Sequence, residues 1–146
     1  RSIAEQIVAT RDAAGRTLLG LRCEGLDLTG FQAGGAVLRD ADFRRCRLEG
    51  ADFGEANLSN ARFRRADLRG ANFRSADVEG ADFSGADLRG ADFRGALLTA
   101  VSFFDVRGEE GKTKVARFDE ATQFEKTALV MLVDEQADFV RAVLGI

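Results

Sequence analysis

Large apolar residues recur at every fifth position through the middle of this chain. From Ala51 to Gly95 the sequence reads as nine consecutive five-residue units, each centred on Phe, Leu or Val. An alanine stands two residues before each centre, and the residue between the two is polar, mostly Asp or Asn. This apolar-polar-apolar alternation predicts a short strand that turns the alanine and the centre to one side and the polar residue to the other.

The two positions after each centre are polar or small, so the alternation stops there and the chain must turn. Glycine ends many of the units, as at Gly70, Gly80 and Gly90, where a corner can use a positive φ angle. A short strand followed by the same turn every five residues winds into a solenoid. We therefore expect a repeat architecture with its apolar residues inside.

The alternation of Phe with Leu or Val indicates how many units make one coil. With four units per coil, each residue lies over the residue twenty positions earlier and like side chains stack, whereas three units would stack Phe on Leu. We therefore expect four units per coil. The predicted core columns are Phe43, Phe63, Phe83 and Phe103; Phe53, Phe73 and Phe93; Leu48, Leu68 and Leu88; and Leu58, Val78 and Leu98.

Tandem units of the form Ala-Asp/Asn-Leu/Phe-x-x resemble the pentapeptide-repeat family over roughly two thirds of the chain. The resemblance implies an all-β solenoid, a right-handed, four-sided parallel β-helix. Counting imperfect units, the frame runs from Leu21 to Asp105 as 17 units, slightly more than four coils. We expect about four to five coils in all. The family implies this fold but no single function.

Residues 1–20 are expected to form an N-terminal helical cap, and residues 21–124 the β-helix. Ser2 and Glu5 have the spacing of a capping box, and Gly15 is a natural stop, which predicts a helix from Ser2 to Ala14. The composition changes over residues 106–115, which we interpret as an inserted loop that replaces two sides of a coil. Phe118 then falls twenty residues after Leu98 and is expected to stack on it.

Residues 125–146 have the three- and four-residue apolar spacing of an amphipathic helix, and Thr122 with Glu125 matches a second capping box. This helix either covers the final coil or forms a homodimer contact. The second alternative rests on analogy with the family's quinolone-resistance members, whose C-terminal helix is used in dimers. The candidate residues for this cap or dimer face are Leu129, Leu132, Val133, Phe139, Val140 and Val143.

Composition leaves little room for catalysis. The chain has 21 Lys and Arg, 24 Asp and Glu, a net charge of −3 and no His, so it has no Ser-His or Cys-His arrangement and no His metal ligand. Cys23 and Cys46 fall at inward positions and are expected to be buried small hydrophobes. We expect no enzymatic activity, no metal, no cofactor and no small-molecule substrate. Neither a signal peptide nor a membrane-spanning run is visible, which favours the cytoplasm and no membrane partner.

Arginines follow several centres, and the twenty-residue rule stacks them in pairs. The candidate partner surface consists of Arg69, Arg74, Arg89 and Arg94, with Asp67, Asp87 and Asp92 beside them to offset their repulsion. This pattern is typical of a solvated surface, or of a charge lattice that an unidentified protein partner recognises.

Two functions fit the sequence. The first is a non-enzymatic protein-interaction or structural scaffold, as solenoids commonly are. The alternative, implied by the quinolone-resistance relatives, is a DNA mimic that binds DNA gyrase or topoisomerase. Residues 16–105 hold nearly equal numbers of Arg and carboxylates, whereas a phosphate mimic should be clearly acidic. The same balance argues against direct nucleic-acid binding, which is not expected.

Overall fold

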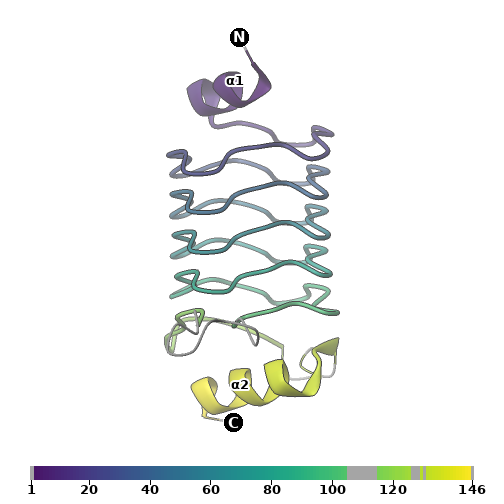
Figure 1. Ribbon diagram of the computed structural model, residues 1–146, viewed down its shortest axis with the longest axis vertical. Helices are drawn as coiled ribbons and strands as arrows, with labels where there is room; N and C mark the ends of the chain where they lie inside the picture. The colour runs from purple at the N-terminus through teal and green to yellow at the C-terminus, as the bar shows by residue number, and fades with distance from the viewer. Residues whose placement is uncertain (1, 105–114, 126–128, 130, 146) are drawn as a thin grey trace, which may run out of the picture.

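The computed structural model describes residues 2–104, 115–125, 129 and 131–145. Figure 1 shows a column of stacked coils with one helix at each end. Helix α1 (Ile3–Thr10) lies over the first coil, and helix α2 (Asp134–Leu144) lies under the last. The two chain termini therefore lie at opposite ends of the column.

Neighbouring coils are joined by single-residue parallel bridges between positions twenty apart. The bridges run from Asp12 with Gln32 to Asp82 with Ser102, and among the described residues no side of a coil forms a longer strand. Backbone hydrogen bonds accompany each bridge; the Phe53 N–H, for example, donates to the Asn72 carbonyl at 2.7 Å. The spacing of twenty gives four units per coil, the number expected from the alternation of centres.

Each corner of a coil falls at the last position of a unit. Every fifth residue from Gly15 to Ala100 has a positive φ, and a turn such as Ala56 N–H to Phe53 carbonyl (3.0 Å) closes the corner. Seven of these corners are not glycine, and they include Glu55 and Arg65. A left-handed backbone costs such residues about 1–2 kcal/mol, so the bonds between coils must hold them in place.

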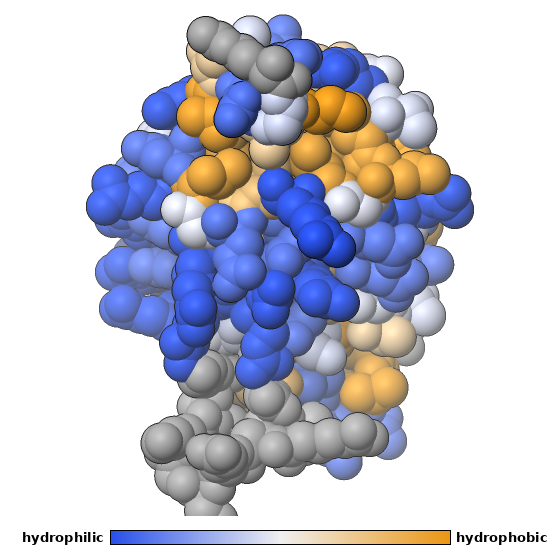
Figure 2. Space-filling view, turned by 45° about the horizontal axis from the view of Figure 1, so that its top comes forward, coloured by the Kyte–Doolittle hydropathy of each residue, from blue (hydrophilic) through white to orange (hydrophobic). Residues whose placement is uncertain are grey.

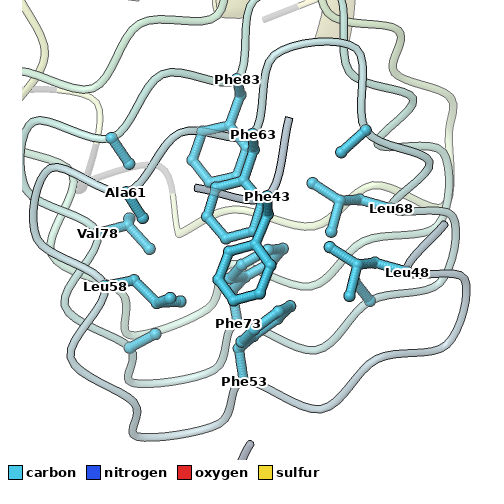
Figure 3. Close-up of a cluster of buried hydrophobic side chains, with 14 of the residues drawn as sticks. Phe43, Leu48, Phe53, Leu58, Ala61, Phe63, Leu68, Phe73, Val78 and Phe83 are labelled. Atoms are coloured by element: carbon cyan, nitrogen blue, oxygen red, sulfur yellow. The ribbon is translucent and has the colours of Figure 1, made fainter. Parts of the chain in front are cut away.

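The apolar centres fill the interior of the column. All thirteen centres expected in the core have no exposed surface. Figure 3 shows two phenylalanine columns in the middle, with leucines of the other two sides flanking them. Rings within a column stack, as Phe63 and Phe83 do at 4.9 Å and 3°, and rings of facing columns meet edge to face, as Phe73 and Phe83 do at 5.4 Å and 86°. Both geometries are favourable for aromatic pairs.

Helix α1 is shorter than the sequence indicated. The predicted capping box is present, because Ser2 Oγ accepts the Glu5 N–H and Glu5 Oε2 accepts the Ser2 N–H. The helix ends at Thr10, however, and not at Ala14. Residues 11–15 instead form the first unit of the solenoid, with Ala13 fully buried. Hydrogen bonds to the next coil outweigh the modest helix preference of this segment, so the repeat begins ten residues before Leu21.

The inserted segment does not replace two sides of a coil. Phe104 and Val115 form an antiparallel bridge, and the intervening part of the predicted loop, residues 106–114, lies outside the described residues. Arg117 bridges to Asp87, so Phe118 continues the column of Leu88 and does not stack on Leu98. That prediction was wrong because the segment is added at the start of a side and the following unit resumes where the interrupted coil stopped.

The capping box predicted at Thr122 and Glu125 is also wrong. Thr122, Gln123 and Phe124 add a further unit to the stack: Gln123 bridges to Asp92, and the Phe124 ring stacks on Phe93 at 5.0 Å. Thr122 Oγ1 donates to the Leu88 carbonyl at 2.8 Å, so it anchors this unit and starts no helix. Helix α2 begins only at Asp134.

Candidate interaction surface

Helix α2 uses part of its predicted apolar face to cover the last coil. Leu129 and Leu132, which precede the helix, are buried, as is Val140 within it. Phe139 is half-buried, and its ring lies 5.4 Å from that of Phe104 and 5.8 Å from that of Phe118. Val133 and Val143 are 54% and 43% exposed. Because these two valines are exposed, the homodimer contact stays a prediction. The other residues of the face pack within the chain.

Gln136 completes the end of the stack, and sequence reasoning missed it. Its Oε1 accepts the Phe103 N–H at 2.7 Å, and its Nε2 donates to the Phe104 carbonyl at 3.1 Å. In regular coils the N–H of a centre binds the following coil, so the Gln136 amide takes the part at Phe103 that the following coil has elsewhere in the stack. The available signal was its spacing, since it lies three residues after Val133 and four before Val140 on the apolar face.

Where the polar residue of a unit is Asp or Asn, it has a structural role on the outside of the column. Its side-chain oxygen accepts the backbone N–H two residues later, as in Asp52 to Gly54 and Asn72 to Arg74, both at 2.9 Å. Asp and Asn are the residues that make this turn readily. The recurrence of these two residue types, and not merely of polar ones, was the sequence signal for this bond.

Several of these aspartates also bind the arginine that follows the centre of their own unit. Arg69 donates from Nε to Asp67 Oδ1 at 2.9 Å and from Nη2 to Asp67 Oδ2 at 2.7 Å, a bidentate pair. This arrangement recurs at Arg44 with Asp42, Arg89 with Asp87 and Arg94 with Asp92.

The four arginines of the candidate partner surface lie on two adjoining sides of the column. Arg69 and Arg89 occupy equivalent positions of adjacent coils on one side, and Arg74 and Arg94 do so on the next. Arg74 differs from the other three, because Asn72 precedes it and its Nη1 lies 3.9 Å from Asp92 Oδ2. All four side chains keep more than a third of their surface exposed.

The ion pairs change the acid-base properties of the aspartates. Hydrogen bonds from the Arg69 side chain lower the pKa of Asp67, and those from Arg89 and Arg94 lower the pKa of Asp87 and Asp92 in the same way. A carboxylate with a lowered pKa in the folded state stabilises the protein above its ordinary pKa, about 3.9. That stabilisation disappears as the pH falls from there through the lowered pKa.

We expect the melting temperature of the protein to fall as the pH is lowered below about 4, and to fall less in a variant carrying Asp67→Asn, Asp87→Asn and Asp92→Asn. Asparagine keeps the acceptor for the backbone N–H, as Asn72 does naturally, but cannot titrate. Thermal melts monitored by circular dichroism across this range measure the difference. Equal acid sensitivity in the two proteins would contradict the assignment of the effect to these pairs.

The two cysteines are buried inside the first coils. Burial raises the pKa of Cys23 to about 11 and that of Cys46 to about 12, and the Cys46 Sγ–H donates to the Cys23 carbonyl. Both are free thiols. Because thiols of such high pKa stay protonated near neutral pH, they lack the reactivity of a nucleophile.

The described residues hold few other features that could bind a ligand. Figure 2 shows apolar surface gathered towards the N-terminal end of the column and polar side chains below it. A shallow groove there is lined by Ala4, Val8, Ala9, Leu26 and Glu5, whose carboxylate already accepts the Ser2 N–H. No group of three or more His, Cys, Asp or Glu among the described residues could hold a metal ion. None of the helices within the described ranges is long and apolar enough to cross a membrane.

The repeats of this chain are similar to those of known proteins. The family model for pentapeptide repeats matches residues 22–60, 46–85 and 61–99, with eight copies. A solved pentapeptide repeat protein from the Arabidopsis thaliana thylakoid lumen is 34% identical over 66% of this chain and 71% of its own, with a TM-score of 0.54. No curated protein sequence matches.

Two further solved structures have lower scores. Rfr23, a pentapeptide repeat protein from the cyanobacterium Cyanothece 51142, is 21% identical over 83% of this chain and 96% of its own, with a TM-score of 0.44. QnrB1, a plasmid-mediated fluoroquinolone resistance protein, is 19% identical over 92% of this chain and 61% of its own, with a TM-score of 0.38. The match of the family model over more than half of the residues, together with the coils that the structure forms from them, shows that this chain belongs to the pentapeptide repeat family.

Proposed function

We propose that this protein is a non-enzymatic scaffold that binds a protein partner through the outer sides of its coils. The observation that carries the proposal is the set of bidentate pairs on two adjoining sides, Arg69 with Asp67, Arg89 with Asp87 and Arg94 with Asp92. Each pair is fixed to the backbone by the turn that its aspartate makes. A surface whose side chains are already ordered loses little conformational entropy on binding.

The right-handed winding implied by the family is part of this proposal, and bridges between residues twenty apart support a column with four sides. Each side offers equivalent side chains at the same position of successive coils. Such a repetitive surface suits recognition of an extended or regular partner. A cytoplasmic location stays a prediction.

The DNA-mimic alternative is less well supported. A mimic of duplex DNA must present columns of unpaired negative charge, yet Asp67, Asp87 and Asp92 are each bound by an arginine of their own unit. Arg62 and Asn72 also interrupt the columns at positions where a carboxylate would be needed. Binding to gyrase or topoisomerase is therefore kept as one outcome of the test below.

Affinity capture from a bacterial lysate tests the scaffold function. The native protein is compared with a variant in which Arg69, Arg74, Arg89 and Arg94 are changed to Ser, and bound proteins are identified by mass spectrometry. A control variant changes three exposed arginines that lie away from these two sides, Arg16, Arg39 and Arg141, to Ser, so that its net charge differs from that of the first variant by one. We expect a protein held by the native chain and the control to be lost from the first variant.

Two results would count against the scaffold proposal. Retention of topoisomerase subunits by the native protein would favour the DNA mimic. Loss of the captured protein from both variants alike would mean that net charge, and not this surface, holds the partner. Melting curves of all three proteins confirm that they are folded before capture.

A further inference from the structure

We propose that a third side of the column is a docking surface for an acidic polypeptide segment. This arginine side consists of residues 21–25, 41–45, 61–65 and 81–85, whose polar positions are joined by bridges from Arg22 to Asp42, Arg62 and Asp82 in turn. It is distinct from the two sides that hold Arg69, Arg74, Arg89 and Arg94. The inference rests on the proposed scaffold function and adds a second surface and the chemistry of its partner.

The arginine side has the opposite charge from the rest of the molecule. It holds six arginines, Arg22, Arg44, Arg45, Arg62, Arg64 and Arg65, against three carboxylates, Glu24, Asp42 and Asp82. The whole chain has a net charge of −3, and each of the other three sides has more carboxylates than arginines among its described residues. Positive charge is therefore concentrated on one side of an acidic protein.

The three carboxylates on this side are already engaged. Asp42 is held bidentately by Arg44, whose Nη2 also lies 3.1 Å from Glu24 Oε2. Asp82 accepts from Arg64 Nη1 at 2.9 Å. Glu24 also faces Arg45 at 3.7 Å. The local carboxylates therefore cannot neutralise the remaining arginines.

Arg22, Arg62 and Arg65 are exposed, and none of them forms an ion pair with another residue that the structure describes. The cause lies in the sequence of the unit 61–65, Ala-Arg-Phe-Arg-Arg, in which Arg62 stands where most units have Asp or Asn. Without a carboxylate in its own unit, Arg64 reaches across to the next coil. Arg62 and Arg65 of this unit therefore present guanidinium groups that are open to an external anion.

Guanidinium groups bind carboxylates and phosphates through paired hydrogen bonds, so both anions suit the exposed arginines chemically. The charge of the other sides favours a polypeptide. A nucleic acid carries a strong field over its whole length and binds proteins through many phosphate contacts on a basic surface. The acidic sides that adjoin the arginine side would repel it, whereas a short acidic segment can lie on the arginine side alone.

Fluorescence polarisation with a fluorescein-labelled oligoglutamate peptide tests this inference on the full chain. We expect binding that weakens as salt is added. A variant with Arg22→Gln, Arg62→Gln and Arg65→Gln should bind at least about tenfold more weakly, the combined effect of three exposed ion pairs. The matched control is Arg16→Gln, Arg39→Gln and Arg117→Gln, which also removes three exposed arginines without a described ion pair and should bind like the native protein.

Three results would overturn the inference: no binding of the peptide, equal weakening in both variants, or tighter binding of a labelled single-stranded oligodeoxynucleotide of equal charge. None of these depends on the lysate experiment. Capture of a partner that needs Arg69, Arg74, Arg89 and Arg94, without peptide binding, would leave the scaffold function standing and remove only the arginine side. Peptide binding without capture would leave the arginine side standing and remove the scaffold function proposed for Arg69, Arg74, Arg89 and Arg94.

Discussion

Replacing Phe73 by alanine is expected to lower the free energy of unfolding by about 3–5 kcal/mol. Phe73 has no exposed surface, and its ring stacks between those of Phe53 at 5.1 Å and Phe93 at 4.8 Å. It also meets the rings of Phe63 and Phe83 edge to face. Alanine leaves a cavity in the middle of the stack that the coils above and below cannot close, because their hydrogen bonds fix the spacing between coils.

Urea denaturation followed by circular dichroism measures this loss. Phe73→Leu is the first control, because leucine is the natural centre of the neighbouring columns and refills most of the volume; it should cost clearly less. Leu19→Ala is the second, since Leu19 is 58% exposed, and it should change stability by about 0.5 kcal/mol or less. A loss below about 1 kcal/mol for Phe73→Ala would contradict the role of the phenylalanine column.

Replacing Gln136 by alanine is expected to cost about 2–3 kcal/mol. The side chain is 1% exposed and serves as both acceptor for the Phe103 N–H and donor to the Phe104 carbonyl. Without it, the buried amide of Phe103 has lost its partner and is shielded from water by α2. Urea denaturation gives the free energy, and hydrogen exchange at the Phe103 amide reports the local loss.

Gln136→Leu separates hydrogen bonding from packing. Leucine keeps most of the volume but has neither donor nor acceptor, so this variant should be about as unstable as Gln136→Ala. If leucine restored native stability, the glutamine would act by filling space alone. Asp138→Ala, on the exposed side of the same helix, is the control for effects on α2 itself and should be nearly neutral.

The regular part of this fold could be predicted from the sequence because one short pattern is repeated many times. An error of one five-residue unit per coil would place every Phe against Leu or Val, so the register of twenty is strongly determined. The ends of the pattern are different. Ala13 fits a helix and a coil equally well by sequence, and only the hydrogen bonds offered by the next coil decide between them.

The register after the insertion could not be predicted for a related reason. A segment of ten residues keeps the five-residue frame whether it replaces two sides or is added between them, and the sequence has no signal for the difference. Phe118 continues the column of Leu88 because the chain resumes on the side that would have followed Ser102 without the insertion. Likewise, the role of Gln136 depends on its lying where a following coil binds the N–H of a centre elsewhere in the stack.

The candidate surface was predicted in part. The stacking of Arg69 with Arg89 and of Arg74 with Arg94 follows directly from the spacing of twenty. The bidentate pairing with an aspartate two residues earlier depends on both side chains leaving the same face of a short strand, which the alternation implied but did not establish. The uneven charge of the four sides becomes visible only when the residues are sorted by side and their partners are known.

The uniform spacing of the bridges also governs how the length of this column can change. Removing residues 61–80 would join Asn60 to Ala81, and Ala81 would take the place of Ala61 with Phe83 beneath Phe43. Both end helices would still meet the sides that they cover now. Removing only ten residues would turn one end of the column by half a coil. Each phenylalanine column would then continue on the opposite side. The column can therefore change its length only in steps of twenty residues if both end helices are to keep covering the sides that they cover now.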